Sequence, residues 1–541
     1  MAKLEIHQIS SLEKVMPYQE NFFVTNRITA LKGERVSWQT AVRADKITPL
    51  FFSAKTELGS SLSVRRVEYV PVELAAYDDN HDDDFISHNA GIYPDILSPI
   101  EKNVIIAKPR MYTVLWITVE IPSDLPSGSY NVEFTFRDAD GTIEAKTVFE
   151  IHVLNIAAQK PKLKYTQWLH TDCIADYYKC RVFSEEYWSM VEKFVEMAVH
   201  TGINMIYTPL FTPPLDTRYG CERTTVQLIG VTKLNNEYSF DFSKLDRWIK
   251  MCNSCGIKTF EFSHLFSQWG AKHTPKIIAE TSCGCEQIFG WKTDSKSKEY
   301  AEFLHRFLPE LIKFLKDKNS EFYFHISDEP TEDSIDCYSY GYNLVKSLIG
   351  DYKIIDAVSE TSLMNYDITE YPVSVIQNAE SFFDFNIKER WIYYSCACNK
   401  DVCNRYIAMP SYRNRAIGLQ FYKYNIDGFL HWGYNFYNSG LSDIRINPFT
   451  VTDSYGLMPA GDAFSVYPAQ NGPVESIRSA VFHDALSDLA ACKLLESLSD
   501  KKSVLDIIEK YGGITFKSYP KSPEKLFDIR ESVNKRIHEL I

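Results

Sequence analysis

From about residue 164 onward the chain alternates strand-like and helix-like segments, and this alternation limits the possible folds more than any other feature. Short runs rich in aromatic and β-branched residues, such as INMIYT and EFYFHIS, are separated by longer segments such as SEEYWSMVEKFVEMAVH and KEYAEFLHRFLPELIKFLKD. Eight strands alternating with helices is the number found in a (β/α)8 barrel of the TIM type, whose parallel strands form an inner ring. The predicted strands span residues 164–170, 203–208, 257–264, 321–327, 352–359, 373–378, 390–396 and 427–433.

The sequence before the predicted barrel has a different pattern. Short alternating runs such as RRVEYVPVEL and SYNVEFTFRD are separated by turn sequences such as DLPSGSY, and no long helical pattern occurs. This predicts an N-terminal antiparallel β-sandwich over residues 1–155, followed by the barrel over residues 160–500. The segment 155–164, which has Lys and Pro residues and few large apolar side chains, is the predicted linker. The charged amphipathic run within residues 501–541 predicts a C-terminal helical extension packed on the barrel.

Two connections in the predicted barrel, residues 209–240 and 265–295, are too long to be simple links. Loops of this size at the C-terminal face of a barrel are usually functional or disordered. These two contain polar and aromatic residues, including Tyr219, Trp269 and His273, and are not low in complexity. We therefore expect them to form walls of a pocket.

The charge and the aromatic content narrow the classes of partner. With 58 Lys and Arg against 71 Asp and Glu residues the net charge is −13, and acids and bases are interspersed. This balance disfavours nucleic acid or an anionic membrane as a partner. Aromatic residues make up 14% of the chain, and Tyr and Trp often lie beside Asn, Asp and His. The mixture suits sugar binding, because pyranose C–H faces stack on rings while hydroxyl groups need fixed polar partners. It suits a large tyrosine-rich core as well.

The N-terminal sequence MAKLEIHQISSLEKVMP has early charges and no apolar run of signal-peptide length, and no later stretch reaches transmembrane length. We therefore expect a cytoplasmic protein whose twelve cysteines stay reduced. Three groups of cysteines have a spacing seen in metal sites, but they lack a paired His signature. Buried or incidental thiols are the favoured interpretation, and we expect neither a metal nor a cofactor. The groups are Cys252 with Cys255, Cys283 with Cys285, and Cys396, Cys398 and Cys403.

A pair of acids ends the fourth predicted strand. The sequence EFYFHISDEP, residues 321–330, alternates apolar and polar residues before Asp328 and Glu329, and Pro330 then ends the strand. This pattern suits a barrel strand with an apolar back and a polar lining. Barrel enzymes keep their chemistry at the C-terminal ends of the strands, so these two acids are the candidate catalytic residues. The alternative is an acidic loop that caps the next helix.

The consecutive positions of Asp328 and Glu329 favour one kind of glycoside hydrolysis. The two carboxyl groups that most glycosidases need flank the scissile bond and usually come from different strands. Two consecutive groups approach a sugar from one side, which fits substrate assistance, in which a 2-acetamido group attacks its own anomeric carbon. Glu329 would then be the general acid and later the base, while Asp328 would stay ionised and orient the acetamide N–H. Repulsion raises the pKa of one of the two carboxyls, and the sequence leaves open which of them carries the proton.

Several segments resemble those of glycoside hydrolase family 123, the β-N-acetylgalactosaminidases and their relatives. The resemblance runs from the predicted sandwich to about residue 500 and rests mainly on HISDEP together with GFLHWGYNFYN. The other segments that carry it are TTVQLIGV, SHLFSQWGAKHTPK, WIYY, GDAFSVYP and GPVESIR. The resemblance implies a β-sandwich followed by a (β/α)8 barrel, and substrate-assisted, retaining hydrolysis in which Asp328 orients the acetamide and Glu329 is the acid/base.

Further residues are candidates for contact with the sugar. Tyr393, at the end of the seventh predicted strand, could hydrogen-bond the acetamide carbonyl from the side opposite Asp328, or be a core tyrosine. Trp432 could form a platform under the sugar ring and Asn435 could bind a hydroxyl group, with core packing and a turn as the alternatives. The remaining candidates are His264, Gln268 and Trp269, which could instead fix a loop, and Trp168, which follows the first strand and faces the same mouth.

The sequence therefore predicts a metal-independent, retaining exo-β-N-acetylgalactosaminidase or close β-N-acetylhexosaminidase that acts on an oligosaccharide or glycoconjugate. One alternative is a glycosidase of the same fold that acts on sugars without an acetamide and uses a second carboxylate such as Glu261. Another is a carbohydrate-binding relative with an inactive barrel. An unsubstituted β-galactoside tests the first alternative, because it should be inert if the acetamide is the nucleophile.

Overall fold

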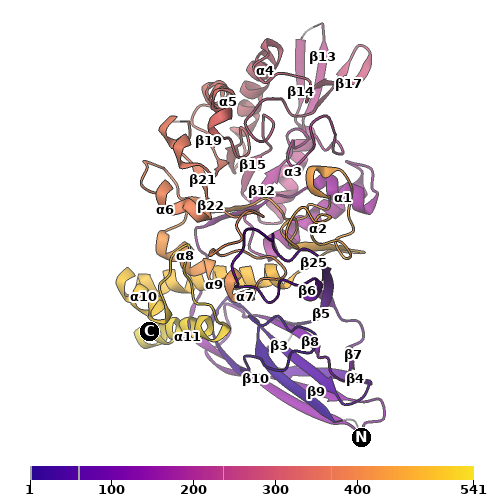
Figure 1. Ribbon diagram of the computed structural model, residues 1–541, viewed down its shortest axis with the longest axis vertical. Helices are drawn as coiled ribbons and strands as arrows, with labels where there is room; N and C mark the ends of the chain where they lie inside the picture. Colours follow the sequence, from indigo (N-terminus) through magenta and orange to yellow (C-terminus); the bar gives the residue numbers. More distant parts are fainter. Residues whose placement is uncertain (1–2, 59–60, 236, 367) are drawn as a thin grey trace.

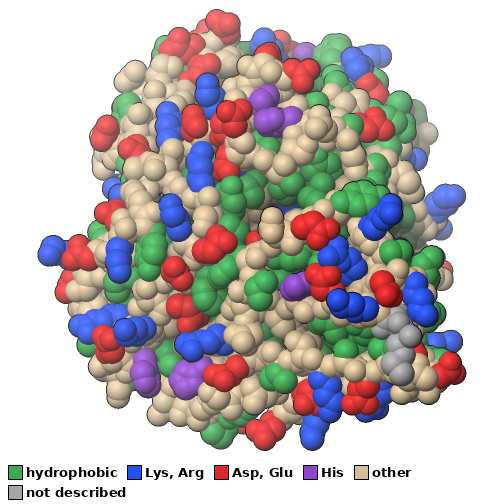
Figure 2. Space-filling view, turned by 60° about the horizontal axis from the view of Figure 1, so that its bottom comes forward, with side chains coloured by type: hydrophobic (Ala, Val, Ile, Leu, Met, Phe, Trp, Pro, Cys, Tyr) green, Lys and Arg blue, Asp and Glu red, His purple; other side chains and the backbone are tan. Residues whose placement is uncertain are grey.

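The computed structural model describes residues 3–58, 61–235, 237–366 and 368–541. In Figure 1 the chain forms two parts along the long axis, with antiparallel sheets at one end and a parallel barrel with surrounding helices at the other. Charged side chains of both signs are interspersed over the face seen in Figure 2. Within the described ranges, no helix combines the length and the apolar character needed to cross a membrane.

Two five-stranded sheets make up the N-terminal part. They pack face to face through a shared apolar cluster, in which Trp38 stacks on Phe149 at a ring separation of 4.2 Å. The strand pairs are antiparallel, as expected from the sequence, except for β10 with β2, which is parallel. The last strand ends at Ala157. One sheet has the order β1 (Leu4–Ser10), β3 (Arg35–Ala44), β8 (Thr113–Glu120), β5 (Leu62–Val72) and β6 (Gly91–Pro99), and the other has the order β2 (Arg27–Lys32), β10 (Glu144–Ala157), β9 (Gly128–Arg137), β4 (Thr48–Thr56) and β7 (Val104–Ala107).

A nine-stranded parallel sheet curves into a nearly closed barrel. Its edge strands, β19 (Lys353–Ile354) and β20 (Asp356–Val358), are separated in sequence only by Ile355. The single strand predicted over 352–359 is divided because β19 pairs with β18 on one side of the barrel and β20 pairs with β21 on the other. The strands between them, in order, are β18 (Glu321–Phe324), β15 (Thr259–Phe262), β12 (Met205–Thr208), β11 (Lys164–Gln167), β23 (Gly428–His431), β22 (Trp391–Tyr393) and β21 (Pro372–Val375).

The helices that alternate with these strands bury one face each against the barrel (Figure 1). α4 shows why, since Tyr300, Phe303, Phe307 and Leu311 recur at helical spacing and are all buried. The helices of this part are α1 (Thr171–Tyr178), α2 (Glu185–His200), α3 (Ser243–Ser254), α4 (Lys298–Leu315), α5 (Ile335–Ile349), α6 (Ala379–Phe382), α7 (Ser411–Arg415) and α8 (Ile417–Tyr424).

The two long connections pair with each other and form a small sheet of their own. Its order is β14, β13, β16, β17, with β13 and β14 from the first connection and β16 and β17 from the second. The first connection therefore packs on the second instead of forming an independent loop. The bounds are β13 (Gly230–Leu234), β14 (Glu237–Asp241), β16 (Ile277–Thr281) and β17 (Gly284–Phe289).

The C-terminal helix contacts both parts of the molecule. It begins after Ser522, whose side chain accepts a hydrogen bond from the N–H of Lys525. The helix lies against α9 and also against β2, where Glu531 accepts hydrogen bonds from the N–H and the hydroxyl of Thr29. The sequence predicted only the barrel as its partner. The elements of this region are β24 (Val466–Ala469), β25 (Gly472–Glu475), α9 (Ile477–Leu498), α10 (Lys501–Ile508) and α11 (Pro523–Leu540).

A buried ion pair joins the sheets to the barrel. Arg478, in the first turn of α9, donates from Nε and Nη2 to the carboxylate of Asp95 in β6, each at 2.9 Å. Its Nη1 donates to the carbonyl oxygens of Gly461 and Phe464 at 2.6 and 2.7 Å. Both charged side chains are almost fully buried. The pair therefore ties β6 to the segment that precedes α9.

We expect Arg478→Met to lower the free energy of unfolding by about 3–5 kcal/mol, because it leaves the carboxylate of Asp95 buried without its partner. Urea unfolding followed by tryptophan fluorescence measures the loss. Arg137→Met is the control, since it removes a half-exposed ion pair with Glu144 and should hardly move the urea midpoint. Equal shifts of the urea midpoint in the two variants would mean that the buried ion pair contributes no more to stability than the half-exposed one.

Candidate active site

Asp328 and Glu329 lie on the turn that follows β18 at the mouth of the barrel. Glu329 has a φ of 43°, which is unusual for a non-glycine residue and above all for one that precedes a proline. Strain of this kind costs about 1–3 kcal/mol and is concentrated at functional sites. The turn is held from outside, because the N–H of Trp269 donates to the carbonyl oxygen of Asp328 at 2.8 Å. The surrounding structure thus fixes both carboxylates in one position.

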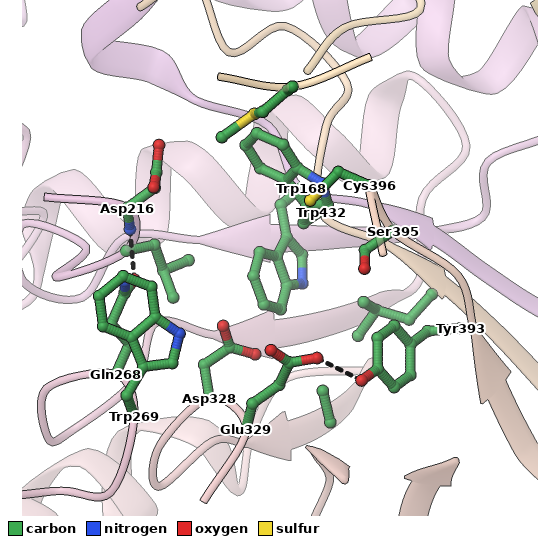
Figure 3. Close-up of a pocket in the computed structure, with 14 residues that line it drawn as sticks. Trp168, Asp216, Gln268, Trp269, Asp328, Glu329, Tyr393, Ser395, Cys396 and Trp432 are labelled. Atoms are coloured by element: carbon green, nitrogen blue, oxygen red, sulfur yellow. Dashed lines mark hydrogen bonds between the residues drawn. The ribbon is translucent and has the colours of Figure 1, made fainter. Parts of the chain in front are cut away.

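The two carboxylates lie at the floor of a cavity. Figure 3 shows them side by side, with Trp168 above them and with Trp269 and Tyr393 on opposite sides. The lining contains three carboxylates, those of Asp216, Asp328 and Glu329, and no Lys, Arg or His is among the described lining residues. A cavity of this charge disfavours an anionic ligand. The rest of the lining consists of Trp168, Leu215, Gln268, Trp269, Ala357, Tyr393, Ser395, Cys396, Leu430, Trp432 and Met458.

Burial and mutual repulsion alter the protonation of the pair. Burial, and next the charge of Glu329, raise the pKa of Asp328 well above its usual range. Burial also raises the pKa of Glu329, but the hydroxyl of Tyr393 donates a hydrogen bond to Glu329 Oε1 and opposes that rise. The pKa values of both carboxyls are therefore raised, and the hydrogen bond from Tyr393 favours placing a shared proton on Asp328.

A buried network of charges supports the floor of the cavity. His325 contacts Glu261 from β15 at 3.0 Å through Nε2 and Asp356 from β20 at 3.2 Å through Nδ1. Burial opposes the charged form of His325, but these two carboxylates outweigh it and raise its pKa to about 9. Asp356 also accepts the N–H of Ile326 at 3.0 Å, and Glu261 accepts the indole N–H of Trp168 at 3.3 Å. The network thus fixes the strand end before Asp328 as well as the ring above it.

His264 belongs to this network rather than to the lining of the cavity. It is buried, its ring stacks on His325 at 4.4 Å, and its Nδ1 lies 3.1 Å from the hydroxyl of Tyr207. Among the described residues, His264, His325 and Asp356 form a group whose possible metal-ligand atoms lie within 4.8 Å of one another. Both ring nitrogens of His325 already contact carboxylates, so the contacts of this group are those of a hydrogen-bonded network.

Trp432 lines the cavity, and a hydrogen bond from its indole N–H orients the ring. Its indole N–H donates to Asp462 Oδ2 at 2.8 Å. Burial raises the pKa of Asp462 to about 7, and His431 Nε2 lies 3.6 Å from its other oxygen. Asp462 stands in the GDAFSVYP segment that the sequence analysis singled out, but nothing in the sequence connects it to Trp432.

The structure brings together most of the residues expected at the site. Trp168, Trp269, Tyr393 and Trp432 line the same cavity as the two acids. Asn435 does not, because its side-chain oxygen accepts the N–H of His170 at 2.8 Å and its amide donates to the carbonyl of His170 at 3.0 Å. The expected hydroxyl ligand is therefore a link between two segments of backbone.

Sequence reasoning missed Asp216, the third carboxylate of the cavity. It lies on the first long connection, and its Oδ2 accepts the N–H of Leu441 at 3.1 Å. Its own N–H donates to the side chain of Gln268. Burial raises the pKa of Asp216 to about 6. The only signal in the sequence was its position in a connection that we expected to form a pocket wall.

Comparisons with known proteins agree with this geometry. The profile described as "Glycoside hydrolase 123, catalytic domain" matches residues 168–495. A family 123 glycoside hydrolase from Clostridium perfringens superposes with a TM-score of 0.72 at 16% identity, over 99% of this chain and 98% of that chain. Bacteroides uniformis β-glucuronidase 3 covers 89% of this chain and 51% of its own, at 11% identity and a TM-score of 0.32, too low to support a shared fold. No curated protein matches. Because the family profile covers more than half of this chain, the chain belongs to glycoside hydrolase family 123.

Proposed function

We propose that the protein is a retaining exo-β-N-acetylgalactosaminidase, or a close β-N-acetylhexosaminidase, that uses the acetamide of its substrate as the nucleophile. The observation that carries the proposal is the position of Asp328 and Glu329, side by side on one turn at the floor of the cavity (Figure 3). Carboxylates placed side by side approach the anomeric carbon from one side, whereas a nucleophile and an acid flank the bond. The absence of cations from the described lining supports a neutral sugar over a sulfated or acidic one.

The reaction then has two steps. In the first, the acetamide oxygen forms a bond to the anomeric carbon while the glycosidic C–O bond breaks and Glu329 gives its proton to the leaving oxygen. Asp328 accepts a hydrogen bond from the acetamide N–H and stabilises the positive charge on the oxazolinium. In the second step, water attacks the anomeric carbon, Glu329 takes a proton from it, and the bond to the acetamide oxygen breaks. Two inversions give overall retention.

Tyr393 links substrate binding to the position of the proton. Its hydroxyl donates to Glu329, which favours the ionised form of that residue. A bound acetamide offers its carbonyl to Tyr393 and its N–H to Asp328. Both changes favour ionised Asp328 and protonated Glu329, so substrate binding moves the proton to the residue that must donate it.

Glu261, the candidate nucleophile of a glycosidase that acts on sugars without an acetamide, is not available for that role. Glu261 is fully buried and is occupied by Thr166, Trp168 and His325, so its carboxylate does not reach the cavity. Asp216 is the remaining carboxylate that lines the cavity beside the pair, and this observation keeps the alternative open. In the proposed reaction Asp216 instead accepts a hydrogen bond from a sugar hydroxyl.

We also infer the predicted division of the chain, with a β-sandwich over 1–155, a (β/α)8 barrel over 160–500 and a helical extension over 501–541. Only Ile355 separates β19 from β20, so the two can be counted as one strand in a ring of eight, which supports this description of the barrel. The Clostridium relative hydrolyses glycolipid glycans, and a glycan substrate is proposed for this chain as well.

Hydrolysis of nitrophenyl β-N-acetylgalactosaminide, β-N-acetylglucosaminide and β-galactoside tests the proposal. We expect release of nitrophenol from an acetamido sugar and none from the galactoside. Asp216→Asn distinguishes the proposed hydrolase from the alternative that needs no acetamide. If Asp216 only binds a sugar hydroxyl, the variant should bind its substrate more weakly but still turn it over. Cleavage of the galactoside that disappears in Asp216→Asn would establish the alternative instead.

We expect Tyr393→Phe to shift the alkaline limb of kcat/KM to higher pH. The hydrogen bond from Tyr393 opposes the rise in the pKa of Glu329, so its removal lets that pKa rise further and the acid stays protonated to a higher pH. The rate plateau should fall, since the acetamide also loses a partner. Tyr394→Phe is the control, because Tyr394 is buried outside the lining. An unchanged pH profile in Tyr393→Phe would contradict the assigned role.

A further inference from the structure

Beyond the catalytic cavity, three aromatic rings form a cluster on the two long connections. Tyr219 comes from the first connection, and His273 and Trp291 come from the second. The ring of Tyr219 lies 5.1 Å from that of His273 and 5.7 Å from that of Trp291, and the last two are 6.0 Å apart. None of the three lines the cavity itself.

Tyr219 is the exposed member of this cluster, and His273 and Trp291 are half-buried. Tyr219 is 64% exposed, although large aromatic side chains are normally buried. Single exposed apolar residues need no explanation, but Tyr219 belongs to a contiguous group of rings. Trp291 is fixed because its indole N–H donates to the carbonyl of Cys221 at 2.8 Å. The cluster is therefore an ordered aromatic surface rather than part of a core.

The same two connections carry part of the catalytic cavity. Asp216 lies three positions before Tyr219 and lines the cavity, as Trp269 does on the second connection. The second connection folds back on itself, since the N–H of Ser267 donates to the carbonyl of His273 at 2.9 Å. Trp269, which is 51% exposed, is anchored directly to Asp328. The cluster is thus carried by the same two connections that supply Asp216 and Trp269 to the cavity.

We propose that Tyr219, with Trp291 and His273 behind it, is a binding site for the part of a neutral glycan that lies beyond the bond to be cleaved. Sugar rings stack their C–H faces on exposed aromatic rings, and these contacts are tolerant of the sugar's exact identity. The proposal rests on the proposed hydrolase function and adds a substrate class: glycans of at least two sugars in preference to simple glycosides.

The test compares Tyr219→Ala with the unaltered protein on two substrates. We expect kcat/KM for a β-N-acetylgalactosaminyl trisaccharide to fall by about 2- to 12-fold, the range of one lost aromatic contact. The value for nitrophenyl β-N-acetylgalactosaminide should stay within about twofold, since this substrate carries no sugar beyond the bond that is cleaved. Tyr219→Phe should keep the trisaccharide activity. Tyr18→Ala, which removes a tyrosine that is 73% exposed on the N-terminal part, should change neither value.

Titration calorimetry with the trisaccharide separates this inference from the proposed function. Weaker trisaccharide binding in Tyr219→Ala, in a protein that hydrolyses nothing, would support the glycan site and overturn only the assigned reaction. Equal losses on both substrates, or no loss in either activity or binding, would overturn the glycan site whether or not the protein is a hydrolase.

Discussion

Glu329→Gln is expected to lower turnover of a β-N-acetylhexosaminide by about 10²- to 10⁴-fold, the usual contribution of a general acid and base. Glutamine has nearly the same shape and still accepts a hydrogen bond from Tyr393, so the fold and the binding of substrate should change little. It carries no transferable proton, so the leaving oxygen departs unprotonated and the incoming water keeps its proton. Steady-state kinetics measures the loss, which should appear in kcat and not in KM.

Two controls make this result specific. Glu332→Gln alters an exposed acid on the turn just after Pro330 and should leave turnover unchanged. A dinitrophenyl leaving group needs little protonation, so Glu329→Gln should lose less on that substrate than on a nitrophenyl glycoside. A loss that is the same for both leaving groups would argue against Glu329 as the general acid.

Asp328→Asn is expected to lower turnover of acetamido substrates by about 10²- to 10³-fold, the size found when one stabilising group in an active site is removed. The asparagine amide cannot stabilise the positive charge of the oxazolinium. In the complex with substrate, where Asp328 is ionised, the change also removes a negative charge beside Glu329 and should lower its pKa, so the alkaline limb of the kcat profile should move to lower pH. This direction is opposite to that expected for Tyr393→Phe.

The pH profile distinguishes a catalytic role of Asp328 from a structural one. Asp333→Asn changes an exposed acid on the same segment and is the matched control. A slower Asp328→Asn enzyme with an unshifted pH profile and a lower melting temperature would indicate that Asp328 only supports the turn. Full activity in Asp328→Asn would exclude it from the mechanism.

The sequence predicted best the positions of residues that are determined by their neighbours along the chain. Alternation in EFYFHIS predicted the strand β18, and its C-terminal end predicted Asp328 and Glu329 at the mouth, because every parallel barrel strand points its carboxyl end to that side. Trp168 and Tyr393 follow the same rule, since each lies at or just after the end of a barrel strand. The division of the strand at Ile355 was not predictable, because it depends on which neighbour each half pairs with.

Residues whose roles depend on distant partners could not be assigned. Asn435 and Trp432 are close in sequence, but only the backbone of His170 shows that the amide of Asn435 is already occupied. Glu261 is an acid on a barrel strand and so resembled a nucleophile. Its burial against His325 and Thr166 is a property of the packed barrel and not of its own segment.

The most direct test of the central claim is the rate of hydrolysis of nitrophenyl 2-amino-2-deoxygalactosides that carry N-acetyl, N-fluoroacetyl, N-difluoroacetyl or N-trifluoroacetyl groups. Each fluorine withdraws electron density from the acyl oxygen and makes it a weaker nucleophile. If the acetamide attacks the anomeric carbon, kcat should fall steeply with every fluorine added. A kcat that stays the same across the series would mean that a group of the enzyme is the nucleophile, and would contradict substrate assistance.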